Sequence, residues 1–177
     1  TASAPDAPAH PSAGDPPSIP PPDSAGDVVL LLTEDDLHPE SLDLGESQVR
    51  AIAGMLCPEE RSPQGVSRNV KTFVADAMTD SLSRAAEHFR PDAAPTMVPA
   101  DASSLIELLA ASGATTVLHA YAPTGSVQQR LVELSAELQP HGLRLMPVLR
   151  DWDRRCWPQA CRGFFPFRQK IPALLPT

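Results

Sequence analysis

Short apolar runs recur along this chain. The first, VVLLL at residues 28–32, is too short for a core helix and lacks the alternation of a strand with one wet face. It predicts a strand buried on both faces, as in a parallel sheet. Four later runs predict further strands, at residues 49–56, 96–98, 115–120 and 143–149.

Segments of helical periodicity lie between these runs. Residues 101–113 begin with Asp101 as the expected N-cap and end at Gly113, and residues 124–142 begin with Thr124 or Ser126 as the cap. A third segment, residues 67–89, predicts a helix with an apolar stripe and three solvent-facing charges. The stripe comprises Val70, Phe73, Val74, Ala77, Met78, Leu82, Ala85 and Phe89, and the charges are Asp76, Asp80 and Arg84.

Alternating strands and helices predict an α/β fold with a doubly wound, mostly parallel, Rossmann-like sheet of five strands. Ligands of such sheets bind beyond the carboxyl ends of the strands, near the switch in strand order. The residues that we expect at this rim, as candidates for cofactor binding, are Thr33, Glu34, Asp101, Tyr121 and Asp151.

The first 26 residues differ from the rest in composition. They are mostly Ala, Pro, Ser, Asp and Gly, which cannot bury enough apolar surface to offset chain entropy. We expect a disordered, solvated tail at 1–26, with a proline-rich ligand for a partner as the alternative, and one domain at 27–177. The absence of an initiator Met fits either simple removal before Thr1 or cleavage of an organellar transit peptide.

Charge and hydropathy narrow the function classes. Fourteen Lys and Arg against 22 Asp and Glu give a net charge of -8 and a pI near 5.0, which disfavours generic nucleic-acid binding. No apolar run approaches the roughly 18 residues of a membrane span, and no secretory signal is visible. These features indicate a soluble intracellular protein, in a chloroplast, a mitochondrion or the cytoplasm.

No complete catalytic or metal-binding motif is present. The chain lacks G-x-S-x-G, G-x-G-x-x-G and a phosphate-binding loop, and its three cysteines do not form a zinc pattern. We expect Cys57 to be buried, and Cys156 and Cys161 to be reduced thiols, although these two could close a small disulfide.

Two features could take part in chemistry. Glu34, Asp35 and Asp36 form an acidic cluster that could orient a ribose or act as an acid/base pair, but we expect a solvated loop with a helix-capping role. For His119 we expect a hydrogen-bonded core histidine, with a ligand-facing residue as the alternative.

Aromatic and basic residues concentrate near the C-terminus. The stretch RDWDRRCWPQACRGFFPFRQK contains both tryptophans, three of the five phenylalanines and six of the 14 basic residues. Such a mixture can anchor a protein interface, stack on single-stranded nucleic acid or pack onto the domain's own sheet. We favour partner docking over nucleic acid and weigh it equally with self-packing. The expected partner-binding residues are Trp157, Arg162, Phe164, Phe165, Phe167 and Arg168.

Three pieces of the sequence share their order and spacing with a known family: VVLLLTEDDL, IAGMLCPEE and the stretch from VPADASSLIELL to RQKIPALL. Through them, residues 27–175 resemble the N-terminal α/β domain of the photolyase/cryptochrome family. The family's opening Arg-rich loop reads LLTEDDLHPESLDLG here and keeps only Asp36 and Leu37. Its charged turn reads YAPTGSVQQR and keeps Pro123 and Arg130.

The resemblance implies that GFFPFRQKIPALL corresponds to the segment leading into the family's helical FAD domain, which we expect this chain to lack. It therefore implies a non-catalytic, photolyase-like structural or interaction subunit without flavin, docking to a protein partner. The alternative that the resemblance leaves open is a module for a nucleotide or an antenna chromophore, such as a folate or a deazaflavin.

Overall fold

The computed structural model of this chain describes Ile19 and residues 26–160 and 163–175. They form two compact units: the sheet unit, which reaches from Ile19 to Arg150, and the C-terminal unit, which begins at Asp151. This division lies inside the range 27–177 that the sequence indicates as one domain. Most of the predicted tail lies outside the described residues, but Ile19 is described and is buried.

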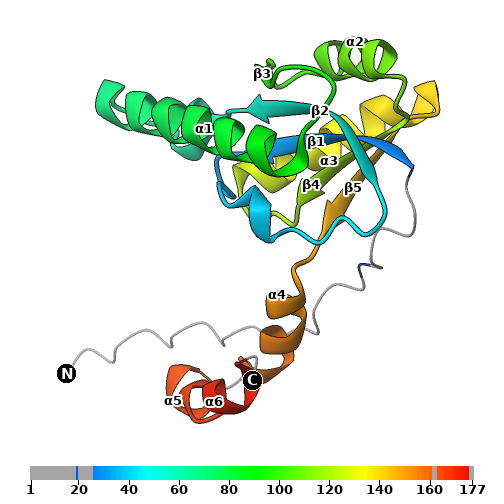
Figure 1. Cartoon of the computed structure of the whole chain (residues 1–177). Coiled ribbons are helices and arrows are strands. Elements are labelled where there is room, and N and C mark those ends of the chain that lie inside the picture. Colours follow the sequence, from blue (N-terminus) through cyan, green and yellow to red (C-terminus); the bar gives the residue numbers. More distant parts are fainter. Residues whose placement is uncertain (1–18, 20–25, 161–162, 176–177) are drawn as a thin grey trace. The chain divides into compact units, whose positions relative to one another are not determined.

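The sheet unit is built on five strands, all parallel, in the order β3-β2-β1-β4-β5 (Figure 1). This confirms the predicted α/β fold, and each apolar run overlaps one strand. The strands are β1 (Asp27–Thr33), β2 (Gln48–Met55), β3 (Thr96–Met97), β4 (Thr116–Ala120) and β5 (Arg144–Val148). The switch in strand order lies between β1 and β4, so a crevice is expected at their carboxyl ends.

Helices cover both faces of the sheet because β1 is apolar on both. Val28, Leu30 and Leu32 join a core beneath α1 (Arg68–Phe89) and the 3-10 turn η1 (Pro39–Ser41). On the other face, Val29 and Leu31 pack under α2 (Ala102–Ser112) and α3 (Ser126–Leu138). Every residue of β1 after Asp27 is buried.

Helix α1 follows only part of its predicted stripe. Val74, Met78, Leu82 and Ala85 are buried, but Val70 is 41% exposed and Phe73 is 71% exposed. The reason is length: 22 helical residues span about 33 Å, whereas the eight residues of β2 span about 26 Å. The first turns of α1 therefore extend past the sheet (Figure 1).

Local contacts fix the ends of the other two helices. Asp101 caps α2 as predicted, since its side chain accepts a hydrogen bond from Ser104 N, and Gly113 ends the helix at φ 72°. The expected cap of α3 is wrong. Gly125 occupies the N-cap position without a side-chain bond, because Ser126 is already the first helical residue.

Short helices make up the C-terminal unit: α4 (Asp151–Cys156), η4 (Trp157–Gln159), α5 (Phe164–Arg168) and α6 (Ile171–Leu174). Within this unit, Arg155 donates to Leu174 O at 3.1 Å and Lys170 donates to Gln159 Oε1 at 2.7 Å. Over the described part of the whole chain, every helix is too short or too polar to cross a bilayer.

Candidate functional site

The carboxyl ends of β1 and β2 are joined through a buried carboxylate. Glu34 follows β1 directly, and its side chain is fully buried. Its Oε2 accepts a hydrogen bond of 2.6 Å from the backbone N–H of Cys57, just beyond β2. Burial raises the pKa of Glu34, while the Cys57 N–H and Arg61 oppose that increase.

Arg61 binds two of the three acidic residues after β1. It ends η2 (Pro58–Arg61), and its Nε lies 3.2 Å from Glu34 Oε1, an ion pair without hydrogen-bond geometry. Its Nη2 donates to Asp35 Oδ1 at 2.6 Å. The expected solvated loop is therefore wrong for Glu34, whose side chain is buried, while Asp35 is an exposed residue that pairs with Arg61 instead of capping a helix.

The third acid, Asp36, forms a two-pronged ion pair with Arg150, the residue that ends the sheet unit. Both side chains are mostly buried, with 16% of Asp36 and 18% of Arg150 exposed. Arg150 also donates to Ser41 Oγ and to His38 O. The β1–β2 connection is thereby fastened to the end of β5.

A second arginine holds the same connection from α1. Arg84 pairs with Glu40 and with Asp80, and it donates to Leu37 O at 2.7 Å. Its predicted role as a solvent-facing charge is therefore wrong, because the β1–β2 connection lies against its helix. Arg84 and Arg150 thus both bind the β1–β2 connection, in which the 3-10 turn η1 is the one helical element.

Cys57 sits beside this cluster, but its environment suppresses thiolate chemistry. Burial, followed by the charges of Glu60 and Glu34, raises the pKa of the thiol to about 11. The predicted burial of Cys57 is confirmed. Near pH 7 the group is a neutral thiol and a poor nucleophile.

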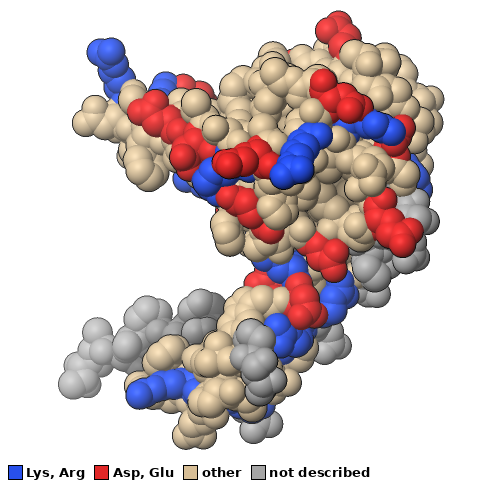
Figure 2. All heavy atoms as spheres, viewed as in Figure 1, with Lys and Arg blue, Asp and Glu red and all other residues tan. Residues whose placement is uncertain are grey.

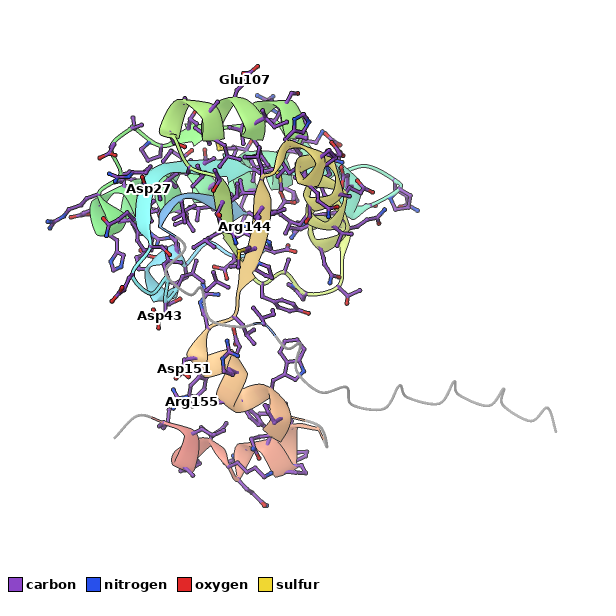
Figure 3. The ribbon with its side chains drawn as sticks, turned by 90° about the vertical axis from the view of Figure 1, so that its right-hand side faces the viewer. Asp27, Asp43, Glu107, Arg144, Asp151 and Arg155 are labelled. Carbon is purple, nitrogen blue, oxygen red and sulfur yellow. The ribbon has the colours of Figure 1, made fainter. Side chains whose placement is uncertain are left out.

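The structure does not gather the five predicted rim residues into one site. Thr33 is buried, and its carbonyl accepts from Asp36 N at 3.1 Å. Asp101 serves as the helix cap, and the N–H of Ser104 and the hydroxyl of Ser103 lower its pKa. Asp151 belongs to the C-terminal unit, where it pairs with Arg155 one turn along α4 (Figure 3). Glu34 lies in the cluster described above, and Tyr121 lines a separate pocket.

This pocket, of about 180 Å³, lies between α3 and strands β4 and β5. His119 on β4 forms part of its wall, and Nδ1 of the ring lies 2.8 Å from Ala120 O. Burial lowers the pKa of His119 to about 4, so the ring is neutral near pH 7. The expected hydrogen-bonded core histidine is confirmed, and because His119 also lines a cavity, the ligand-facing alternative stays a prediction.

In the C-terminal unit the predicted docking residues differ in exposure. Phe164 is 63% exposed and Phe165 is 73% exposed, and their rings meet edge to face with centroids 5.6 Å apart. Trp157 and Phe167 are half-buried and Arg168 is exposed, while Arg162 lies outside the described residues. Cys156 is a buried free thiol, and Cys161 is outside the described residues.

The comparisons with known proteins, and the metal-binding side chains of the described residues, add no further site. Comparison with models of protein families and with curated proteins finds no match to either. Among the described residues, no three His, Cys, Asp or Glu side chains are grouped as metal ligands. The resemblance to photolyases therefore stays a prediction.

Sequence reasoning found the acids of the rim but missed their partners. Arg61 and Arg150 each follow a strand at its carboxyl end, as the acids do, and that shared position was the available signal. The pocket wall contributed by α3 had no comparable signal, because Gln128 and Ser135 are ordinary residues of a helix surface.

Proposed function

We propose that this chain is a non-catalytic interaction subunit, a photolyase-like α/β domain that docks to a protein partner through its C-terminal unit. The observation that carries the proposal is the exposed pair Phe164 and Phe165. Large aromatic side chains dominate the binding energy of many interfaces, and two adjacent exposed rings are costly to leave in water. Arg168, also exposed, is of the residue type enriched beside such anchors.

The charge of the C-terminal unit supports an acidic partner surface. Residues 151–177 contain five Lys and Arg and two Asp, a net charge of +3, so residues 1–150 carry -8 - 3 = -11. In Figure 2 blue side chains outnumber red ones on the visible part of the C-terminal unit. Opposite charges favour encounter and orientation of the partners.

The engaged acids at the sheet rim support the non-catalytic part of the proposal. Glu34 and Asp35 bind Arg61, and Asp36 binds Arg150. A general base must be free to approach the proton that it removes. Each of these carboxylates is instead committed to fastening one segment of the unit to another.

Single alanine substitutions test the docking surface. The chain is used as bait, and bound proteins are identified by mass spectrometry for the original chain and for Phe164→Ala, Phe165→Ala and Phe73→Ala. Phe73 is a matched control, because it is 71% exposed but lies on α1 of the sheet unit. We expect loss of one partner with either C-terminal variant and full capture with Phe73→Ala.

Two results would refute docking through this unit. One is equal capture by all variants. The other is a lower Tm for Phe164→Ala and Phe165→Ala with no partner found for the original chain, which would mean that the rings close the protein's own core. Because the proposed surface is basic, capture should also weaken as salt rises from 0.05 to 0.5 M, concentrations chosen so that the Debye length falls from above to below about 10 Å.

We further propose that the chain works inside the cell, in the cytoplasm or in a chloroplast or mitochondrion after removal of a transit peptide. The free thiols of Cys57 and Cys156 fit a reducing compartment, where disulfides are rare. Imaging of the fluorescently tagged precursor tests it, and secretion of the tagged protein would contradict it.

A further inference from the structure

The pocket beside His119 is a site that the docking proposal does not use. Its wall is largely apolar, with Leu131 and Val132 from α3 and Leu145 and Pro147 from β5. Its polar side chains are those of His119, Tyr121, Gln128 and Ser135, and none of the lining residues carries a formal charge at pH 7. An apolar hollow with a few polar groups is the usual form of a small-molecule site.

His119 gives the pocket a directional acceptor. Its side chain is buried, and Ala120 O can only accept a hydrogen bond, so the proton of the neutral ring resides on Nδ1. Nε2 is then left with a lone pair. No described residue is hydrogen-bonded to Nε2, and Nε2 is not among the fully buried polar atoms that lack a partner, so its lone pair keeps surface that a ligand in the pocket can reach.

We infer that this pocket binds a small, uncharged aromatic molecule that donates one N–H or O–H hydrogen bond to Nε2 of His119. The donor follows from the fixed tautomer, and the aromatic body follows from the apolar side chains of α3 and β5. A charged ligand would lose its hydration without finding an opposite charge in the wall.

The volume limits the size of this ligand. An apolar cavity of about 150 Å³ holds one benzene ring, and drug-sized ligands occupy about 300 Å³ or more. At about 180 Å³ the pocket suits one ring or a compact fused pair. A whole folate or deazaflavin is too large to be enclosed, so this inference is distinct from the antenna alternative.

Indole and 1-methylindole form a matched pair of probes. Both are flat and uncharged, but only indole has an N–H to donate. We expect indole to bind with a Kd of about 1 mM or lower, the range open to a ligand of this size. The loss of one hydrogen bond should weaken 1-methylindole about tenfold, which corresponds to about 1.4 kcal/mol.

Two substitutions at one position provide the matching control in the protein. Ser135 is half-buried on α3 and lines the pocket, and Leu and Ala are both good helix formers. Ser135→Leu should fill the pocket and weaken indole binding at least tenfold. Ser135→Ala should leave the affinity within about twofold, since it removes only a hydroxyl.

Binding is measured on the full, isotope-labelled chain by titration in two-dimensional NMR, which also reports whether each variant is folded. The inference is supported by indole-dependent shifts confined to α3, β4 and β5, with 1-methylindole and Ser135→Leu weakened as stated. Equal affinity for both probes would overturn the role of His119. Shifts elsewhere, no shifts at 5 mM indole, a test concentration about five times the expected Kd, or unchanged binding by a folded Ser135→Leu would overturn the site.

Discussion

Replacing Arg150 with alanine should destabilise the sheet unit more than replacing any exposed arginine. The guanidinium group makes two bonds to Asp36 and further bonds to Ser41 Oγ and His38 O. After the substitution, Asp36 keeps only the backbone N–H of His38, at 3.2 Å, among the described residues. A mostly buried carboxylate would then lack a cation.

The size of the effect follows from this burial. Breaking a buried ion pair by removing one partner costs about 3–5 kcal/mol, and the partial exposure of this pair places the expected loss near 2–3 kcal/mol. For a unit of this size that loss lowers Tm by about 10 °C. Arg150→Lys should recover only part of it, because an ammonium group cannot form the two-pronged pair.

Arg50→Ala is the control for this experiment. Arg50 also binds two acids, Asp27 and Asp92, but 38% of its side chain is exposed. Its partners are exposed as well, with 45% of Asp27 and 69% of Asp92 accessible. Surface pairs contribute little, so its Tm should hardly change. Thermal unfolding followed by circular dichroism compares the variants, with Asp36→Ala and the double variant completing a cycle. Equal loss of Tm in Arg150→Ala and Arg50→Ala, or full additivity in the cycle, would refute the reasoning.

Three other outcomes can be measured on the purified protein. Burial lowers the pKa of His119 from 6.5 to about 4, so as the pH falls the unfolded chain takes up a proton on this ring before the folded chain does. The free energy of unfolding should therefore keep its full value above pH 6.5 and fall by up to about 3 kcal/mol as the pH drops to 4. Urea titrations measure this fall, which should be shallower in His119→Asn. Gly113→Ala should cost about 1 kcal/mol, because its φ of 72° is strained for alanine although no atom blocks the new Cβ; Gly113→Asn should cost less by the same assay, and equal losses would contradict this explanation. The proposed interaction subunit should show only the aromatic absorption band near 280 nm, roughly where Trp and Tyr absorb, and the pocket beside His119, of about 180 Å³, does not enclose a whole antenna chromophore; a stoichiometric visible band would favour the chromophore alternative.

The fold was largely predictable because burial on both faces leaves a direct mark on a sequence. The run at β1 has no polar position from Val28 to Leu32, and that pattern fits a central parallel strand better than an edge strand. Asp101 and Gly113 were likewise predictable from local chemistry, since a cap and a left-handed stop each need a particular residue type. The exposure of Phe73 was not, because it depends on the length of α1 relative to the sheet.

Of the candidate site, the sequence predicted the acidic residues but not the arginines that bind them. An acidic run after a strand cannot reveal its partners when they lie far away in sequence. Arg61 is 26 residues from Asp35, and Arg150 is 114 residues from Asp36. The pairing arises from the parallel sheet, which brings the ends of β1, β2 and β5 to one edge. The sequence indicated that edge of the sheet, but it did not indicate which loops would bring an arginine to the acidic residues there.

The two outer strands bear on how a partner can attach to the sheet unit. Arg144 N donates to Thr115 O and Val148 O accepts from Tyr121 N, so Arg144 and Val148 face β4. Leu145 and Pro147, which alternate with them, direct their backbone outward. Proline has no N–H, and this removes one of the donors that an added strand would need.

At the opposite edge, β3 has only two residues and offers a short template. Extension of the sheet by a partner strand is therefore unfavourable at both edges. We therefore expect the partner proposed above to bind through side chains rather than through backbone pairing. The described side chains with the largest exposed aromatic surface are Phe73, Phe164 and Phe165, and only the last two stand together as a pair beside basic residues. The edge geometry is consistent with the proposed docking through the C-terminal unit, and the comparison of Phe73→Ala with Phe164→Ala and Phe165→Ala tests side-chain docking at each of the two places.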